Sequence, residues 1–135
     1  MSKYCLDTFA LMSFLQGEPG AKKVVDILES ARGGKAKVYT HAVSLIEIYY
    51  TTLRTEDKIK AYEVLVRVKS LPMEISYFSE EDIISIGELK AKYKISLADA
   101  FCISLAIKNE AKIVTGDPEF KEVEKFVPIE WLPRK

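Results

Sequence analysis

The sequence has few of the residues that most often bind transition metals or act as nucleophiles. Its 135 residues include one histidine, His41, and two cysteines, Cys5 and Cys102. One histidine excludes a histidine-rich metal site, and a Ser-His-Asp triad would depend on His41 alone. The cysteines lie in apolar stretches without CxxC spacing, so they indicate no zinc or redox site. We interpret them as buried thiols, with a disulfide as the less favoured alternative, and His41 as a residue that helps to start a helix.

Long hydrophobic runs and an excess of one charge are also missing. No run approaches a membrane span, and the N-terminal MSKYCLD lacks the apolar core of a signal peptide, so we expect a cytoplasmic protein. Lysine plus arginine and aspartate plus glutamate number 20 each, which gives a net charge of zero. Any electrostatic binding of nucleic acid must therefore depend on a local basic patch. Without repeats or linkers, residues 1–135 are expected to form a single domain.

Short apolar segments alternate along the chain with segments of helical periodicity. Strands are predicted at 3–7, 37–40, 73–78, 112–115 and 126–132. Helices are predicted from about Thr8, over 20–32, around 46–53, from an N-cap at Thr55, from Ser79 and over 97–108. In the helix capped by Thr55, we expect Ile59, Tyr62 and Val66 to face the core. Alternating strands and helices favour an α/β fold, a parallel sheet sandwiched between helices in three layers.

Four acidic residues each have an ordinary structural explanation. Asp7 and Asp117 can cap helices, and Pro118 after Asp117 is typical of a helix start. Glu47 and Asp99 each follow a serine by three residues, which is the spacing of a capping box. SEED at 79–82 has the same spacing, and we interpret its Asp82 as structural. The capping-box pattern alone therefore does not indicate a site.

The surroundings of the four acids favour a site all the same. Asp99 has Ile95 and Ile103 four residues to either side, and Glu47 has apolar face neighbours too. In addition, Asp7 and Asp117 follow predicted strands, whereas Glu47 and Asp99 lie in first helical turns. Carboxyl ends of strands and starts of helices meet at one edge of an open α/β sheet, where ligands bind. We therefore expect these acids to converge.

Convergent carboxylates need protons or cations. Two of them about 4 Å apart repel by about 4 kcal/mol at an effective dielectric constant near 20. No lysine or arginine lies within two residues of any of the four acids. Oxygen-only ligands suit Mg²⁺ or Mn²⁺, ions that activate water and stabilise charge on phosphoryl oxygens. Thr8 and Thr115 are expected to hold the carboxylates by hydrogen bonds, behind the ligands.

These motifs, in this order, resemble the PIN-domain family, and most closely the small VapC-type toxins of toxin–antitoxin pairs. The resemblance covers essentially the whole chain, and the closing PIEWL is similar to the last strand of the family. Phe9 departs from the pattern, because a small or polar residue is common there. The matching segments are LDTF at 6–9, SLIEIYY at 44–50, ISLADAFCISLA at 95–106 and IVTGDPEF at 113–120.

The resemblance implies a function as well as a fold. It implies a PIN-like domain over 1–135 and a metal-dependent endoribonuclease that hydrolyses single-stranded RNA. It also implies a homodimer and a small antitoxin that lays a chain segment across the acidic pocket. Its catalytic and metal-binding acids would be Asp7, Glu47, Asp99 and Asp117, with Mg²⁺ or Mn²⁺ as the cofactor.

Other interpretations stay open at the level of sequence. KAKYK at 90–94 could contact RNA with Tyr93 stacked on a base, although a solvated helix face with Tyr93 in the core is the preferred interpretation. The acids could also form a non-catalytic pocket for a cation or a partner's basic residue, or belong to an RNA-processing nuclease outside any toxin–antitoxin pair. A receiver-like phosphoacceptor and an acid-dyad phosphatase are disfavoured, because Asp7 has no second acid beside it.

Overall fold

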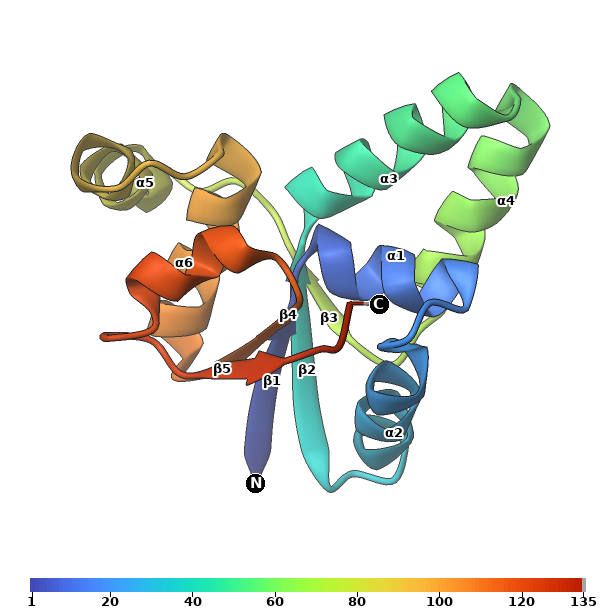
Figure 1. Cartoon of the computed structure of the whole chain (residues 1–135), viewed down its shortest axis with the longest axis horizontal. Helices are drawn as coiled ribbons and strands as arrows, with labels where there is room; N and C mark the ends of the chain where they lie inside the picture. Colours follow the sequence, from blue (N-terminus) through green and yellow to red (C-terminus); the bar gives the residue numbers. More distant parts are fainter. Residues whose placement is uncertain (135) are drawn as a thin grey trace.

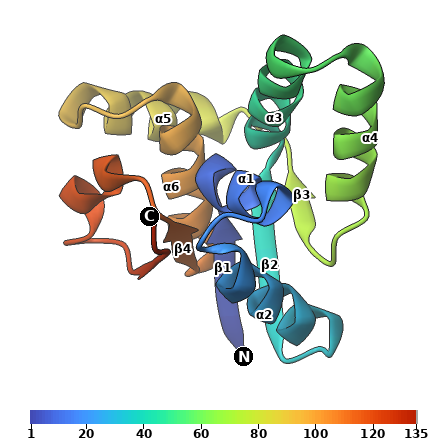
Figure 2. The ribbon, with the colours of Figure 1, turned by 45° about the vertical axis from the view of Figure 1, so that its right-hand side comes forward.

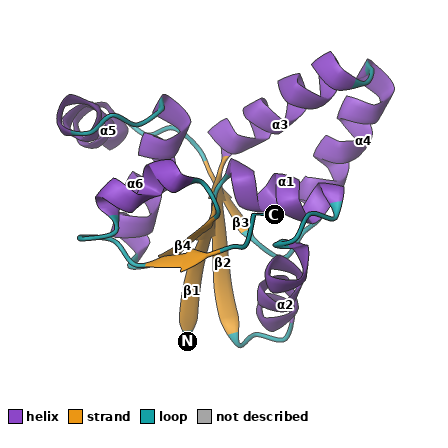
Figure 3. Ribbon diagram, viewed as in Figure 1, coloured by secondary structure: helices purple, strands orange, loops and turns teal. Residues whose placement is uncertain are grey.

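Five short strands lie side by side in one parallel sheet, in the order β3-β2-β1-β4-β5 (Figures 1 and 3). The computed structural model describes residues 1–134. Each pair of neighbouring strands is parallel, so their carboxyl ends share one edge. The strands are β1 (Ser2–Leu6), β2 (Ala36–His41), β3 (Glu74–Ser76), β4 (Lys112–Thr115) and β5 (Ile129–Trp131).

Helices connect these strands and cover both faces of the sheet (Figure 2). Within residues 1–134, no helix is both long enough and apolar enough to cross a membrane. The helices are α1 (Thr8–Gln16), α2 (Ala21–Arg32), α3 (Ala42–Thr55), α4 (Lys58–Lys69), α5 (Glu81–Lys92), α6 (Leu97–Asn109) and the 3₁₀ helix η1 (Pro118–Val123).

Successive residues of the central strands supply two separate hydrophobic cores. Leu6 and Val114 belong to the core beneath α1, α2 and α3, whereas Cys5 and Ile113 belong to the core beneath α6 and η1. This alternation follows from the pleat of a strand, which points neighbouring side chains to opposite faces. The predicted three-layer α/β fold with a parallel sheet is therefore confirmed.

The predicted course of the chain around α4 was wrong. Thr55 is the last residue of α3, and Asp57 caps α4 by accepting a hydrogen bond from the Lys60 N–H at 2.8 Å. The three residues expected inside are exposed, Ile59 by 72%, Tyr62 by 52% and Val66 by 67%. The reason is that α4 packs on α3 in a hairpin that extends away from the sheet (Figure 1). Only Ala61 and Val68 of α4 are buried.

The single histidine and the two cysteines have the structural roles expected of them. His41 caps α3, because its Nδ1 accepts a hydrogen bond from the Val43 N–H at 3.0 Å. Burial lowers the pKa of His41, which favours the neutral ring that this hydrogen bond requires. Cys5 and Cys102 are buried free thiols whose sulfur atoms lie 3.6 Å apart.

The core beneath α6 should contribute strongly to stability. Ile103 of α6 is fully buried in that core. Ile103→Ala is expected to lower the free energy of unfolding by about 2–5 kcal/mol, because it leaves a cavity that the packed helix cannot fill. Urea denaturation measures this change. Ile84→Ala is the matched control, since Ile84 is 66% exposed and its truncation should cost less than about 0.5 kcal/mol. Equal losses in both variants would contradict this assignment of the core.

Candidate metal centre

The four predicted acids all lie at or near the carboxyl edge of the sheet. Asp7 directly follows β1, and Asp117 follows β4 after one intervening residue, Gly116. Glu47 lies on α3, which begins where β2 ends, and Asp99 lies in the first turn of α6. Since β1, β2 and β4 are neighbours in the sheet, sites far apart in the sequence are brought to the same edge.

Asp7 is the most deeply buried of these acids, with 3% of its surface exposed. One carboxylate oxygen accepts a hydrogen bond from the Ala10 N–H at 2.8 Å and so caps α1. The other accepts a hydrogen bond from the Thr115 hydroxyl. Burial, with smaller contributions from the charges of Asp99 and Asp117, raises the pKa of Asp7 from 3.8 to about 8 in spite of these donors. The predicted cap is therefore real, but it leaves a buried carboxylate with no cationic partner.

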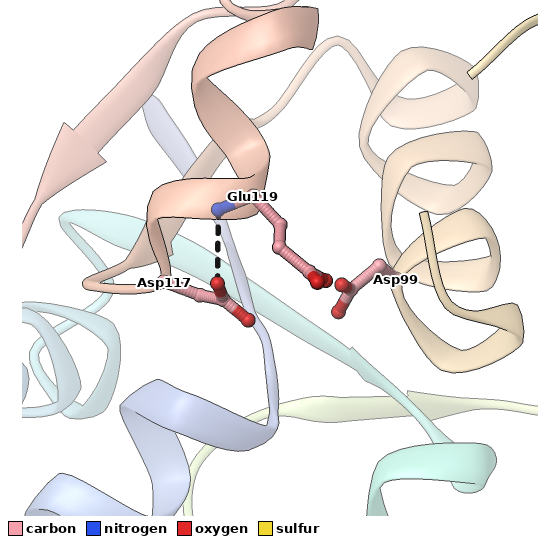
Figure 4. A group of neighbouring side chains, drawn as sticks. All are labelled: Asp99, Asp117 and Glu119. Atoms are coloured by element: carbon pink, nitrogen blue, oxygen red, sulfur yellow. Dashed lines mark hydrogen bonds between the residues drawn. The ribbon is translucent and has the colours of Figure 1, made fainter. Parts of the chain in front are cut away.

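Asp99 and Asp117 come together with a third acid, Glu119. One carboxylate oxygen from each residue can be chosen so that all three lie within 4.8 Å of one another. In Figure 4 these side chains point toward one another from α6 and from the start of η1. Asp117 also caps η1, because its Oδ1 accepts a hydrogen bond from the Glu119 N–H at 2.9 Å. Such a group of oxygen atoms can hold a hard divalent cation.

Ser96 and Asp99 form only half of the expected capping box. The Ser96 hydroxyl accepts a hydrogen bond from the Asp99 N–H at 3.1 Å and starts α6. The Asp99 carboxylate instead lies among the other acids. Burial raises its pKa from 3.8 to about 7, and the Asp117 and Glu119 carboxylates raise it as well. Ser96 therefore has the structural role, while the Asp99 side chain remains available to a ligand.

Glu47 has no capping role either. The cap of α3 is His41, so Ser44 already lies inside the helix. The Glu47 carboxylate instead accepts a hydrogen bond from the hydroxyl of Thr8, the residue next to Asp7. Glu47 is therefore linked to the site through the first turn of α1, and it lies outside the group formed by Asp99, Asp117 and Glu119.

Thr115 connects the two acids that follow β1 and β4. Its hydroxyl donates to Asp7 and accepts a hydrogen bond from the Asp117 N–H at 3.0 Å. Thr115 is completely buried, so this geometry is held by the sheet itself. Both threonines expected to orient the carboxylates, Thr8 and Thr115, make such contacts.

No positive side chain neutralises this cluster. Within residues 1–134, neither the four predicted acids nor Glu119 forms an ion pair with lysine or arginine. Carboxylates grouped in this way repel one another unless protons or a cation intervene. The donor set consists of oxygen atoms only, so the residues fit Mg²⁺ or Mn²⁺.

Glu119 is the one member of the cluster that sequence reasoning did not predict. It lies only two residues after Asp117, inside the segment IVTGDPEF. Its position two residues after Asp117, in the turn that Asp117 and Pro118 begin, was the feature of the sequence that could have indicated a place beside Asp117. Whether its side chain turns toward Asp99 depends on how η1 packs against α6.

The basic segment at 90–94 is partly used by the fold. The Lys90 ammonium donates to the carbonyl of Ile95 at 2.6 Å, and the Tyr93 ring packs against Phe126 with 5.3 Å between centroids. Tyr93 is thus engaged in packing. Lys92 and Lys94 remain exposed beside the start of α6.

Comparison with solved structures shows which proteins share this fold. VapBC2 from Rickettsia felis, bound to a DNA fragment from its promoter, matches with a TM-score of 0.77 and 20% identity, covering 97% of this chain and 99% of that chain. VapC20 from Mycobacterium tuberculosis, a toxin that cleaves the sarcin-ricin loop, matches with a TM-score of 0.73 and 15% identity, covering 96% of this chain and 99% of that chain. A toxin–antitoxin complex from Klebsiella pneumoniae matches with a TM-score of 0.65 and 16% identity, covering 89% of this chain and 92% of that chain.

Comparison of the sequence with family models identifies the domain. No curated protein matches the chain significantly. The model of the PIN domain matches residues 4–126, a span that contains every acid described above. Since this match covers most of the sequence as well as the site, the chain belongs to the PIN domain family.

Proposed function

We propose that this chain is a Mg²⁺- or Mn²⁺-dependent endoribonuclease that hydrolyses phosphodiester bonds of single-stranded RNA as the toxin of a toxin–antitoxin pair. The observation that carries the proposal is the group of Asp99, Asp117 and Glu119 carboxylates beside buried Asp7, which make no ion pair with lysine or arginine in the part of the chain that the structure describes. Membership of the PIN domain family supports nuclease chemistry at these acids. The toxin that cleaves the sarcin-ricin loop supports RNA as the substrate.

Each acid has a distinct task in this proposal. Asp99, Asp117 and Glu119 would hold the cation, and Asp7 would hold it directly or through water. A divalent ion bound there supplies charge for the phosphoryl oxygens and lowers the pKa of water. Glu47, oriented by Thr8, directs the attacking water or binds a second ion. Thr115 hydrogen-bonds to both the Asp7 carboxylate and the Asp117 N–H, and so holds Asp7 and the backbone of Asp117 in fixed positions relative to each other. In the hydrolysis, a water molecule would lose a proton and bond to phosphorus, and the leaving ribose oxygen would take up a proton as its bond to phosphorus breaks.

Substitution of the clustered acids tests the nuclease proposal. Asp99→Asn and Asp117→Asn are expected to lower the rate of Mg²⁺- or Mn²⁺-dependent cleavage of a single-stranded RNA by about 100-fold or more, because each removes a charged ligand of the cation that would stabilise the transition state. Glu119→Gln is expected to lower it by a similar factor, about 100-fold or more, because it removes another charged ligand proposed for the cation. The assay follows cleavage of a labelled oligonucleotide with and without metal.

Asp82→Asn is the control for these substitutions. Asp82 has the same spacing to a serine as Asp99, but its carboxylate accepts a hydrogen bond from the Ser79 N–H and lies outside the cluster. Its substitution should leave cleavage unchanged. Cleavage that persists in both Asp99→Asn and Asp117→Asn would exclude the mechanism. A wild-type chain that binds Mn²⁺ but cleaves no RNA would indicate a non-catalytic binding pocket.

The raised pKa values predict how metal and pH affect stability. Asp7 and Asp99 have folded-state pKa values of about 8 and about 7, above the ordinary 3.8, so the unfolded chain releases these protons at lower pH. Without metal, stability should therefore fall as pH rises from about 4 to about 8. Between pH 6.5 and 8.5, the Tm measured in a chelator is expected to decrease. Mn²⁺ should raise the Tm more at pH 8.5 than at pH 6.5, because it binds the deprotonated carboxylates.

Asp7→Asn isolates the contribution of the buried carboxylate. An amide oxygen can still cap α1, but no charge remains in the core. In a chelator, this variant should have a higher Tm than the wild type at pH 8.5 and a weaker dependence on pH. An unchanged pH dependence would show that Asp7 does not titrate in this range.

The partner in this proposal is a small antitoxin that covers the acidic pocket, and the implied homodimer belongs to the same proposal. The complex from Klebsiella pneumoniae supports an antitoxin as partner. The hairpin of α3 and α4 offers a surface for it, because Tyr50, Leu53, Ile59, Tyr62 and Val66 are exposed there. Exposed apolar patches of this kind often mark sites of protein association.

Co-purification tests this partner. A small protein encoded beside this chain's gene is expected to bind the wild type and to suppress RNA cleavage. Val66→Glu should weaken that binding by about tenfold or more, since it places a charge in a contact surface. Val25→Glu, on the exposed side of α2, is the matched control and should bind normally. If no neighbouring gene product binds, an RNA-processing nuclease outside a toxin–antitoxin pair becomes the better description.

A further inference from the structure

Gly116 is packed edge-on against the ring of Phe9. A Cβ atom built on Gly116 would lie 2.4 Å from Cε1 of Phe9 and 2.6 Å from its Cζ. Distances below about 3 Å do not occur between unbonded carbon atoms, so no residue larger than glycine fits while the ring stays in place. Gly116 does not adopt a left-handed backbone conformation. Glycine is therefore needed here because of the ring, and not because of the backbone dihedral angles.

The two partners in this contact each adjoin acids of the cluster. Gly116 joins Thr115, the last residue of β4, to Asp117. Phe9 lies in the first turn of α1, two residues after Asp7 and next to Thr8. The ring therefore fills the space between the helix that holds Asp7 and Thr8 and the backbone that leads into Asp117.

Polar contacts also join the first turn of α1 to β4 and the residues after it. The Thr115 hydroxyl bridges Asp7 and the Asp117 N–H, and the Asp7 N–H donates to the carbonyl of Val114 at 3.5 Å. When both are ionised, the carboxylates of Asp7 and Asp117 repel each other, and this repulsion opposes these contacts. A rigid aromatic ring against a bare Cα atom limits how the two segments can move relative to each other.

We propose that Phe9, seated on Gly116, is a positioning residue for the metal cluster. The ring does not contact the cation. It sets the separation of α1 from the Thr115–Asp117 backbone and so fixes the position of Asp7 relative to Asp117 at the proposed cation site. This inference rests on the proposed function, because it assigns the residue a role toward that cation.

A double-mutant cycle tests the contact. The proteins are the wild type, Phe9→Ala, Gly116→Ala and the double variant, and the measurement is the Mn²⁺ dissociation constant from titration calorimetry. Phe9→Ala and Gly116→Ala are each expected to weaken Mn²⁺ binding by about tenfold or more, as for residues that support metal ligands. The double variant should bind Mn²⁺ more tightly than Gly116→Ala alone, because the added methyl group enters space that the ring has left.

Phe14→Ala separates positioning from general packing. Phe14 lies on the same helix, is half-buried, and packs its ring against the guanidinium of Arg67, away from the acids. Urea denaturation should show a loss of stability in both Phe9→Ala and Phe14→Ala. Only Phe9→Ala should lose affinity for Mn²⁺. If Gly116→Ala does not fold, Phe9→Leu replaces it. This variant keeps a large apolar side chain but lacks the ring. It should still bind Mn²⁺ more weakly than Phe14→Ala does.

The possible outcomes are distinct. Wild-type Mn²⁺ affinity in both Phe9→Ala and Phe9→Leu would overturn the positioning role and leave the proposed nuclease intact. Strictly additive effects in the cycle would likewise overturn it, because the ring and Gly116 would then act independently. A wild-type chain that does not bind Mn²⁺ would overturn the proposed function and this inference together.

Discussion

The buried carboxylate of Asp7 is the constraint on which the rest of the site depends. Removing a carboxylate from water is costly, and here only the Ala10 N–H and the Thr115 hydroxyl compensate for the lost water. Neither donor neutralises the charge, so the pKa of Asp7 is raised to about 8. The nearby Asp99 and Asp117 increase this cost. The site therefore opposes folding electrostatically, and the hydrophobic cores on both faces of the sheet must outweigh it.

Parallel strand topology is what makes such a concentration of acids possible. β1, β2 and β4 all end at the same edge, and helices begin directly beyond it. Backbone N–H groups at these helix starts hold Asp7 and Asp117 through capping hydrogen bonds. The same contacts that satisfy a helix terminus therefore also orient a ligand. Structural and functional roles are not alternatives for these residues, since the capping hydrogen bond occupies Oδ1 in both, and the Oδ2 of Asp7 is oriented by the Thr115 hydroxyl.

The hydrophobic pattern was sufficient for much of the interior but not for the outer helix pair. Apolar strands such as KIVT are buried on both faces of the sheet, and their apolar composition predicts this burial. α4 has apolar residues that remain exposed, Ile59 and Val66 among them, so its pattern resembles that of a core helix although it lies at the surface. Periodicity records which side chains are apolar, but it does not record whether a partner covers them.

The sequence by itself determined the fold class, the placement of Asp7 and Asp117 after strands, and the expectation that scattered acids gather at one edge. These features follow from local rules: strand composition, helix starts and the geometry of parallel sheets. Only the tertiary structure decided that Glu119 joins Asp99 and Asp117, that Glu47 is held by Thr8, and that the ring of Phe9 requires Gly116. Each of these depends on how close two separately encoded elements approach, and that distance is set by the packing of the whole domain.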